Sequence, residues 1–482
     1  MSCCTEQQHE ENMDAIDELI DFGLNTAYDD LPAEVVERTR MAILDTLGAM
    51  LAGTRGEGVD MLSDLVHEWG GSGQATLVTT GQRMPMHNAA LLNATAARAW
   101  DLDDVHEQNT CHVFASIVPA LLAVAEARGP VSGKDALASA AIAAETVCRL
   151  SSAPRASFSE TGSSLTYQCA QYAVALMAAC LLKLTRTETR HALGIAHAKL
   201  SGNQQGFLAG AMTVRLMQGV SAESGIVSAL MAEKGLTGST EILEGKFGYF
   251  HVHHHGRYER ADIVDSLGTR WELLQTSIKP ASPCCKYTHA PIAAAIEARQ
   301  TVGDTDSVEK LCIRVTNREV HDLVCLPRER KWNPDTLTAA QFSLPFTVAH
   351  AFIYGRVDLA SFQSEGRTDP AVKAFMRRIE IDTDFQQQGD SRGTFPMPGH
   401  VTVHLKGGGE KTAEVTYVKG HPKNPMAMEE VAEKFHACTE FAGLARDRSE
   451  QIAQKIMEMH TLPDVGQLMV LCSGMTTAEH PQ

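Results

Sequence analysis

The sequence is poor in positive charge, and this deficit argues against two classes of partner. Its 482 residues include 42 lysines and arginines against 59 aspartates and glutamates, which gives a formal net charge of −17 at pH 7. A nucleic-acid backbone and an anionic membrane would both repel such a chain, so we expect neither as a partner. An acidic surface still permits a local basic pocket, and a small anionic substrate therefore stays open.

Long apolar runs, paired cysteines and a targeting segment are also missing. No uninterrupted apolar run reaches about 18 residues, so the sequence predicts no membrane span. The twelve cysteines include no C-x-x-C pair, which favours free thiols in a reducing cytoplasm over a disulfide framework. The opening residues, MSCCTEQQHEEN, are polar and acidic and lack the pattern of a signal or transit peptide. We therefore expect a cytoplasmic protein.

Helical periodicity dominates the first half of the chain. Between residues 16 and 234 apolar side chains recur at helical spacing, and no long segment alternates with period two. Gly53 is a natural stop after one such run. The expected helices cover residues 13–27, 30–53, 86–100, 117–128, 133–150, 167–184, 187–200 and 217–234. They predict a large all-α domain over residues 1–272.

The composition changes near Leu273. An extended segment with two prolines (277–287) is followed by a helical pattern (289–300) and a strand-like one (310–315). Two alternating segments, 400–405 and 412–418, flank three glycines and predict a hairpin. We expect a smaller α+β domain over residues 273–422 and a helical return to the first domain over residues 423–482. The predicted fold class is mainly α.

Acidic and imidazole side chains gather beside an apolar helical pattern at residues 94–126. Asp101, Asp103, Asp104 and His106 fall within six positions, and His112 follows shortly after. Burying such groups without partners is costly, so a chain that keeps them beside a core helix is expected to use them. We therefore place the candidate site here.

A second set of candidate groups lies in the extended segment after residue 277. Lys279, Tyr287 and His289 supply a cation, a phenol and an imidazole on one short stretch. Such a set suits the binding of an acid and the removal of a proton next to its carboxylate. A surface lysine is the plain alternative for Lys279.

Three other patterns carry competing interpretations. Asp103, Asp104 and Glu107 form D-D-x-x-E, which on a helix resembles the Mg²⁺-diphosphate motif of terpene synthases. The low aromatic content, 6%, argues against a carbocation cavity, and a solvated acidic helix end is a further alternative. The histidines at 251 and 253–255 favour an exposed loop over a metal site, since no further ligand stands at suitable spacing. The adjacent Cys284 and Cys285 could include a nucleophile, but no base is fixed to either.

Five stretches in register resemble the MmgE/PrpD family of 2-methylcitrate dehydratases, cis-aconitate decarboxylases and iminodisuccinate epimerases. The stretches are AILDTLGAMLAG (42–53), DLDDVHEQNTCHVFASIVPALL (101–122), GAMTVRLMQGVSAESG (210–225), SIKPASPCCKYTHAPI (277–292) and AQFSLPFTVAHAFIYGRVDLAS (340–361). The resemblance implies a helical domain built from both chain ends, an α+β lid, a homodimer and a site between the domains. It also implies a small di- or tricarboxylate substrate and no metal or organic cofactor.

The resemblance assigns roles to individual residues. Asp101 matches the first family aspartate, His112 the site histidine, Lys279 the lid lysine and Arg215 a basic residue of a second motif. Several positions depart from the family pattern, and each departure removes a donor, a charge or a base: Val105, Ser164, Val214, Met217 and Phe346. A missing general acid or base typically costs about a hundred- to ten-thousand-fold in rate. We therefore expect a substrate that has fewer carboxylates than the family's usual substrates or is more hydrophobic than they are.

The residues that are present still permit proton abstraction next to a carboxylate. In this hypothesis Lys279 and Arg215 hold the carboxylate, and His112 moves the proton. Asp101 or Asp104 orients His112 or serves as the partner acid, and Tyr287 donates at the second face. The remaining candidate substrate-binding residues are His106, His289 and Ser164. A lyase or isomerase is the first prediction; an inactive relative that binds carboxylates and the Mg²⁺-dependent diphosphate lyase are the alternatives.

Overall fold

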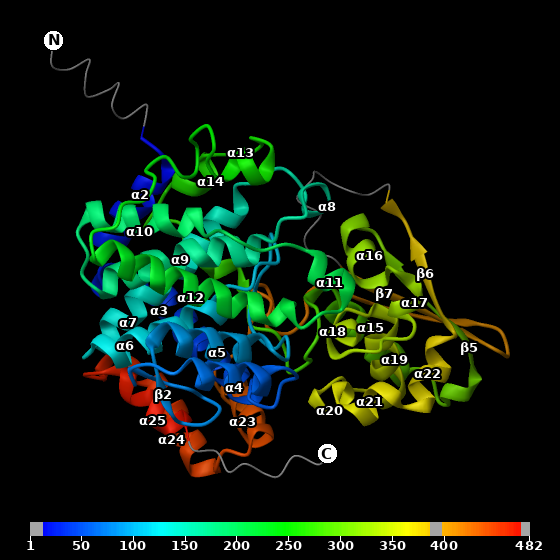
Figure 1. Ribbon diagram of the computed structural model, residues 1–482. Coiled ribbons are helices and arrows are strands. Elements are labelled where there is room, and N and C mark those ends of the chain that lie inside the picture. The colour runs from blue at the N-terminus through cyan, green and yellow to red at the C-terminus, as the bar shows by residue number, and fades with distance from the viewer. Residues whose placement is uncertain (1–12, 386–397, 474–482) are drawn as a thin grey trace.

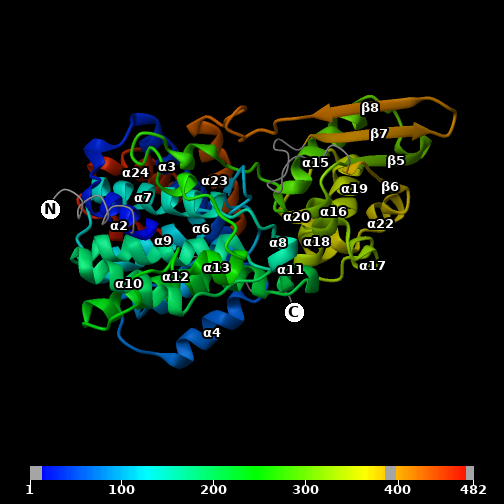
Figure 2. The same cartoon turned by 90° about the horizontal axis from the view of Figure 1, so that it is seen from above.

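The computed structural model describes residues 13–385 and 398–473, which form two lobes that lie side by side in both views (Figures 1 and 2). One lobe is helical and contains both ends of the described chain. The other, called the lid here, runs from α15 to β8 and combines helices with a sheet. This arrangement confirms the predicted mainly α fold, while the exact domain limits stay a prediction. The first twelve residues, on which the expectation about targeting rests, lie outside the described residues.

Long helices with many small residues build the helical lobe. α12 packs against α5, α9 and α10, and α5 packs against α3 and α6. A Cβ atom on Gly219 of α12 would lie 2.2 Å from the Leu91 carbonyl oxygen of α5, so the two backbones approach closely only because this residue is glycine. The long helices of the lobe are α2 (Ala15–Asn25), α3 (Ala33–Gly53), α4 (Val59–Trp69), α5 (Met86–Arg98), α6 (Phe114–Arg128), α7 (Gly133–Ser152), α9 (Leu165–Leu181), α10 (Arg186–Ala198) and α12 (Thr213–Glu233).

The chain returns from the lid to the helical lobe at its C-terminal end. α23 (Met428–Ala442) packs along α3, and α24 (Arg446–Met457) and α25 (Leu468–Cys472) follow it. A Cβ atom on Gly48 of α3 would lie 3.2 Å from the Phe435 Cα atom, which shows how closely α23 approaches. In Figure 2 the red α24 and the orange-red α23 accordingly lie beside the blue α3.

The lid is built on a four-stranded sheet of order β6-β5-β7-β8. β5 (Val308–Val315) pairs in parallel with β6 (Ile379–Thr383) and antiparallel with β7 (Gly399–Leu405). β7 and β8 (Glu410–Val415) form the hairpin that the sequence predicts. α15 (Lys286–Gln300) packs on β7, β8 and α19 (Leu344–Tyr354). The other lid helices are α16 (Arg318–Cys325), α17 (Arg328–Lys331), α18 (Leu337–Gln341), α20 (Leu359–Phe362), α21 (Ser364–Thr368) and α22 (Pro370–Met376).

A short antiparallel ladder joins the acidic stretch to the segment that leads into the lid. β3 (Val105–His106) pairs with β4 (Thr276–Ser277), so that Val105 stands opposite Ser277. This ladder places Lys279 beside Asp101, although 178 residues separate them. The remaining short strands and α-helices of the helical lobe are β1 (Ala75–Thr76), β2 (Arg83–Met84), α8 (Phe158–Thr161), α11 (Gln205–Ala209), α13 (Tyr249–His254) and α14 (Ala261–Val264).

Two local predictions are wrong. The D-D-x-x-E segment is not helical: Asp103 and Asp104 lie in a loop, and β3 follows them. The histidines at 251–255 do not form an exposed loop, because α13 includes three of them and His254 is 1% exposed against Tyr249. Both errors arise because polar residues carry no periodic signal once they pack against a partner. None of the described helices combines the length and the apolar character that a membrane span requires.

Candidate active site

The site loop, residues 101–112, connects α5 to α6 and begins with a strained residue. Asp101 has φ of 54°, in the left-handed region that non-glycine residues rarely adopt, although aspartate tolerates it better than most. Its carbonyl oxygen and its carboxylate both accept hydrogen bonds from the Lys279 ammonium, at 2.5 Å each. The lysine therefore holds this backbone conformation and the side chain together.

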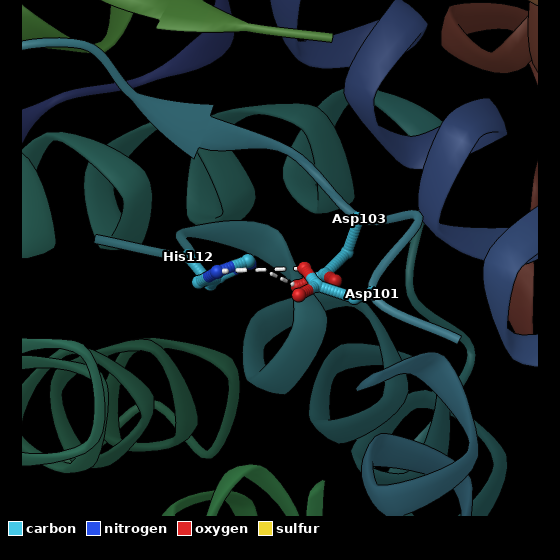
Figure 3. Close-up of side chains that lie close together, drawn as sticks. All are labelled: Asp101, Asp103 and His112. Atoms are coloured by element: carbon cyan, nitrogen blue, oxygen red, sulfur yellow. Dashed lines mark hydrogen bonds and ion pairs between the residues drawn. The ribbon is translucent and has the colours of Figure 1, made fainter. Parts of the chain in front are cut away.

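Two carboxylates of the loop point toward one imidazole (Figure 3). His112 Nδ1 donates to Asp103 Oδ2 at 2.8 Å, and His112 Nε2 lies 3.8 Å from Asp101 Oδ1. Behind the carboxylates, the Arg98 guanidinium at the end of α5 lies 2.8 Å from Asp101 and 3.5 Å from Asp103. Two buried acids thus face two buried cations, and the neutral balance lets the cluster exist inside the protein.

The charges of this cluster set its protonation states. Burial alone would raise the pKa of Asp101 and Asp103, but Arg98, Lys279 and His112 outweigh it and hold both carboxyls below their ordinary pKa. Burial, assisted by Arg98, lowers the pKa of His112 although Asp103 opposes this. The imidazole is therefore neutral at pH 7, with its proton on Nδ1 and a free lone pair on Nε2. An aspartate that orients a histidine in this way makes the outer nitrogen a base.

Asp104 has a different role from its neighbours. Its two oxygens accept hydrogen bonds from the Phe114 and Val113 backbone amides, at 3.0 and 3.3 Å, and so cap the start of α6. Burial, followed by the Asp103 charge, raises the pKa of Asp104 to about 8. The side chain is therefore turned to the backbone of α6 and does not orient His112.

A buried ion pair between α23 and α3 lies next to the site loop and stabilises it. Lys434 of α23 lies 2.6 Å from Asp45 of α3. The same ammonium donates to the Leu102 carbonyl at 2.7 Å and to the Lys279 carbonyl at 2.9 Å. One lysine thus connects the site loop, the segment leading into the lid and the helical lobe.

A cavity of about 80 Å³ lies between the helical lobe and the lid at His112. Among the described residues that line it, the charged ones are Arg98 and Lys286, and none is a carboxylate. The polar wall also contains Asn109, Thr110, Ser164, Thr166, Gln204 and Tyr287, and the apolar wall contains Phe158, Leu165, Phe207, Leu323 and Phe342. A larger cavity of about 460 Å³ shares Phe158, Gln204 and Leu323 with it. The cavity is therefore lined by two cations, an imidazole and a group of apolar side chains.

The structure brings some of the sequence-predicted residues to this cavity. Tyr287 lines it, and its hydroxyl lies 3.1 Å from Thr110 Oγ1. Ser164 lines it too, where it precedes α9 as the N-cap residue. Burial raises the pKa of Tyr287, so its hydroxyl keeps its proton at neutral pH. Asp101 and Lys279 do not line the cavity; Asp101 lies beside His112, and Lys279 binds Asp101.

The other three predicted residues lie elsewhere. Arg215 donates to the Glu57 carbonyl at 2.9 Å and to Thr338 Oγ1 at 2.8 Å, and burial lowers its pKa to about 10. His289 Nε2 lies 3.0 Å from the Cys284 carbonyl, and burial lowers the pKa of this imidazole to about 3. His106 is fully buried in β3, where burial lowers its pKa. None of the three lines the cavity.

Two alternatives from the sequence fit this geometry poorly. The three carboxylates of D-D-x-x-E serve different partners: Asp103 faces His112, Asp104 caps α6, and Glu107 lies 2.5 Å from the Lys286 ammonium. Asp101, Asp103 and His112 are close enough to share a metal ion, but Arg98 and Lys279 already neutralise both carboxylates. Cys284 and Cys285 are buried, and burial raises the pKa of Cys285 to about 12, so neither presents a thiolate.

Most of the positions that depart from the family pattern do not line the cavity. Ser164 lines it, whereas Val105, Val214, Met217 and Phe346 do not. Phe346 lies in the lid core against Phe362. The cavity wall therefore changes less than the five departures suggest.

Sequence reasoning missed Arg98, Lys286, Asp45 and Lys434. A lone arginine in the alanine-rich run before Asp101 is a signal for Arg98, because i,i+3 partners on a helix meet. Lys434 has no such signal, since it lies 332 residues from the carbonyl that it contacts.

Comparison with known families and proteins identifies the class to which this fold and site belong. The model of the MmgE/PrpD N-terminal domain matches residues 17–261, and that of the C-terminal domain matches residues 282–459. The chain belongs to the MmgE/PrpD family, which confirms the resemblance inferred from the sequence.

The curated relatives are similar over nearly their whole length. The cis-aconitate decarboxylase of Aspergillus terreus is 25% identical, over 94% of this chain and 95% of its own. Cis-aconitate decarboxylase-like protein oryM of Aspergillus oryzae is 25% identical, over 92% and 94%. The human cis-aconitate decarboxylase is 25% identical, over 93% and 92%. At 25% identity to these relatives, the chain is a divergent member of the MmgE/PrpD family.

Proposed function

We propose that this protein is a metal-independent lyase or isomerase that moves a proton next to a carboxylate of a small di- or tricarboxylate. The cavity wall carries this proposal: its described charged residues are two cations, and an oriented neutral imidazole stands beside them. Such a wall offers an anion cationic hydrogen-bond donors and a base. Membership in the family and the named activity of the relatives support a lyase at this coarser level.

The roles of the residues follow from their contacts. His112 Nε2 takes the proton, and the imidazolium that forms lies between the Asp103 and Asp101 carboxylates. The cations of the wall stabilise the negative charge that develops on the substrate carboxylate. Lys279 and Arg98 hold the two aspartates in place, and Tyr287 donates a proton at the second face. With a leaving group on the neighbouring carbon the result is elimination, and without one it is epimerisation or isomerisation.

Cis-aconitate is the first substrate to try, because the relatives are named for its decarboxylation. In that reaction the bond to the departing CO₂ breaks, and its electron pair enters the conjugated carboxylate system. A proton from Tyr287, the donor of this scheme, is then added to carbon. The apolar wall formed by Phe158, Phe207 and Phe342 also favours substrates with a hydrophobic end. We therefore include less acidic diacids beside cis-aconitate.

The test is proton NMR in D₂O with EDTA present. The protein is incubated with citrate, 2-methylcitrate, cis-aconitate, iminodisuccinate and simpler substituted diacids. We expect deuterium at a carbon next to a carboxylate, and we expect His112→Ala to abolish it. His404→Ala is the control, since His404 lies on the lid hairpin and pairs with Glu410.

Each other outcome selects a different function. Binding without exchange across the panel would establish the inactive carboxylate-binding relative. Activity that needs Mg²⁺ and disappears in EDTA would favour the diphosphate lyase. Exchange at the wild-type rate in His112→Ala would remove that residue from the mechanism.

We also propose that the protein is a cytoplasmic homodimer. Met61, Leu65 and Trp69 recur every fourth residue on α4 and are 64%, 40% and 54% exposed, so they form an apolar stripe suited to a second copy. The ten cysteines of the described chain are free thiols, as expected in a reducing compartment. Light scattering on a sizing column should give the mass of two chains, and Trp69→Glu should give one. A monomeric wild type would contradict the dimer.

A further inference from the structure

We propose that Lys286, the first residue of α15, binds a carboxylate of the substrate and determines how many carboxylates the cavity accepts. This inference rests on the proposed function, because it assigns the anion-binding group of the same cavity. It concerns a residue that the family pattern did not single out. The ligand class is a polycarboxylate in which one carboxylate lies away from the reacting carbon.

The two cations that the hypothesis from the sequence assigned to the substrate carboxylate are already occupied. The Lys279 side chain is fully buried, and its ammonium donates twice to Asp101. The Arg215 guanidinium bridges the Glu57 carbonyl and Thr338. Neither residue lines the cavity. A substrate carboxylate therefore needs another partner.

Lys286 is placed to be that partner. It lines the cavity together with His112, and its side chain is 14% exposed, whereas that of Arg98 is 1% exposed. The Arg98 guanidinium also forms ion pairs with Asp101 and Asp103. Of the two cations in the cavity wall, Lys286 is thus the more accessible.

The surroundings of Lys286 hold the ammonium in position without using all of it. Glu107 Oε1 lies 2.5 Å from Nζ, and Ser277 Oγ lies 3.5 Å away, at the outer limit of a hydrogen bond. A lysine ammonium has three protons, so at least one donor is left for a ligand. Glu107 is held in turn, since His421 Nε2 lies 3.5 Å from its other oxygen. Burial lowers the pKa of Lys286, and Glu107 opposes this and favours the charged form.

In this arrangement one residue, Lys286, binds the substrate, and another, His112, moves the proton. The Lys286 charge comes from the lid, whereas His112 belongs to the helical lobe. A carboxylate on Lys286 would therefore bridge the two lobes and orient the rest of the substrate toward the imidazole. Since Lys286 acts as a point charge on a non-reacting group, it should contribute to binding and little to the chemical step.

Calorimetry in EDTA tests the inference with an unreactive probe. Tricarballylate, a saturated tricarboxylate, is titrated into wild type, Lys286→Met and Lys310→Met, and glutarate is titrated as the diacid reference. Lys310 is the matched control, because it is an exposed lid lysine that pairs with Glu380 at 2.8 Å. We expect Lys286→Met to weaken tricarballylate binding by roughly tenfold to a hundredfold, as for a lost charged hydrogen bond. The preference for tricarballylate over glutarate should vanish with it, and Lys310→Met should bind as wild type does.

A second variant guards against misfolding. Lys286→Met leaves the buried Glu107 carboxylate without its cation. An uncompensated buried charge destabilises a protein more than the removal of both charges does. Lys286→Met combined with Glu107→Gln removes both charges, and we expect the same loss of affinity with near-normal thermal unfolding. Wild-type affinity in either variant, an equal loss for both ligands, or no binding by wild type would overturn the inference.

The result is distinct from that of the proposed function. Loss of tricarballylate binding in Lys286→Met without any solvent exchange by wild type supports this inference and contradicts the proposed chemistry. Solvent exchange by wild type with unchanged binding in Lys286→Met does the reverse. Where wild type is active, Lys286→Met should raise KM and leave kcat within a few-fold, a split that a general structural defect would not give.

Discussion

Asp103 Oδ2 lies 2.8 Å from His112 Nδ1, and this contact determines which nitrogen of the imidazole carries the proton and which is left as a base. A carboxylate accepts only from a protonated nitrogen, so the proton stays on Nδ1 and the lone pair on Nε2. Asp103 itself is held by Arg98 at 3.5 Å. The basicity of His112 Nε2 therefore depends on Asp103, a side chain that does not line the cavity.

Asp103→Asn should lower the rate of proton exchange by about a hundred- to ten-thousand-fold, because an amide can donate to Nδ1 and reverse the tautomer. The rate is measured by NMR in D₂O, beside the thermal unfolding curve. Asp382→Asn is the control, since Asp382 forms an exposed ion pair with Arg314. A rate within threefold of wild type would show that Asp103 does not orient the base.

The pH dependence should show a base with a low pKa. Burial, assisted by Arg98, lowers the pKa of His112 below its ordinary value near 6.5, and only the neutral imidazole accepts a proton. Activity should therefore be nearly constant at and above pH 6.5 and should fall as the pH drops through a lower midpoint. The profile of kcat/KM from pH 4.5 to 8 measures this midpoint. A midpoint at or above 6.5 would contradict a buried neutral His112.

The sequence predicted the helices well because their signal is local. The spacing predicts a helix over residues 133–150, and α7 covers Gly133–Ser152. It predicts that a helix ends at Gly53, and α3 ends there. In such a run, the helical spacing of the apolar residues is enough to indicate which face is buried. The D-D-x-x-E segment was misleading because acidic residues at three-residue spacing occur in helices and in loops alike, and no apolar periodicity decides between the two.

The partners in the site could not be predicted because they are distant in sequence. Lys286 meets Glu107 across 179 residues, and Lys434 meets Leu102 across 332. The residue type gives no indication of these contacts, since any single lysine is most often exposed. Arg215 shows the converse: its position matched a family motif, yet its guanidinium faces Thr338 and not the cavity.

The buried pair beneath the site loop should be important for stability. Lys434→Met removes the only cation bonded to Asp45 among the described contacts and leaves the Leu102 and Lys279 carbonyls without this donor. Breaking a buried pair on one side costs about 3–5 kcal/mol, so the urea midpoint should fall markedly. Adding Asp45→Asn should restore part of the loss, because it removes the uncompensated charge. Lys310→Met, which breaks an exposed pair, should stay within about 1 kcal/mol of wild type.

Asp104 should make the protein less stable as the pH rises. Burial and Asp103 raise its pKa to about 8, whereas the pKa of an unfolded aspartate is about 3.9. A raised folded pKa stabilises the protein fully below the unfolded value, and this stabilisation is lost as the pH rises through the folded one. Between about pH 4 and pH 8 the loss approaches 1.4 kcal/mol per pH unit for a single group.

Asp104→Asn tests this, because asparagine does not titrate. The variant should be less stable than wild type at pH 5, since its amide nitrogen cannot accept from a backbone amide as the lost oxygen did. Its free energy of unfolding relative to wild type should then rise steadily toward pH 8. Urea unfolding at five pH values measures the difference, in which the other titrating groups cancel. A difference that stays constant with pH would show that Asp104 is ionised throughout, and that the α6 amides and not burial control its charge.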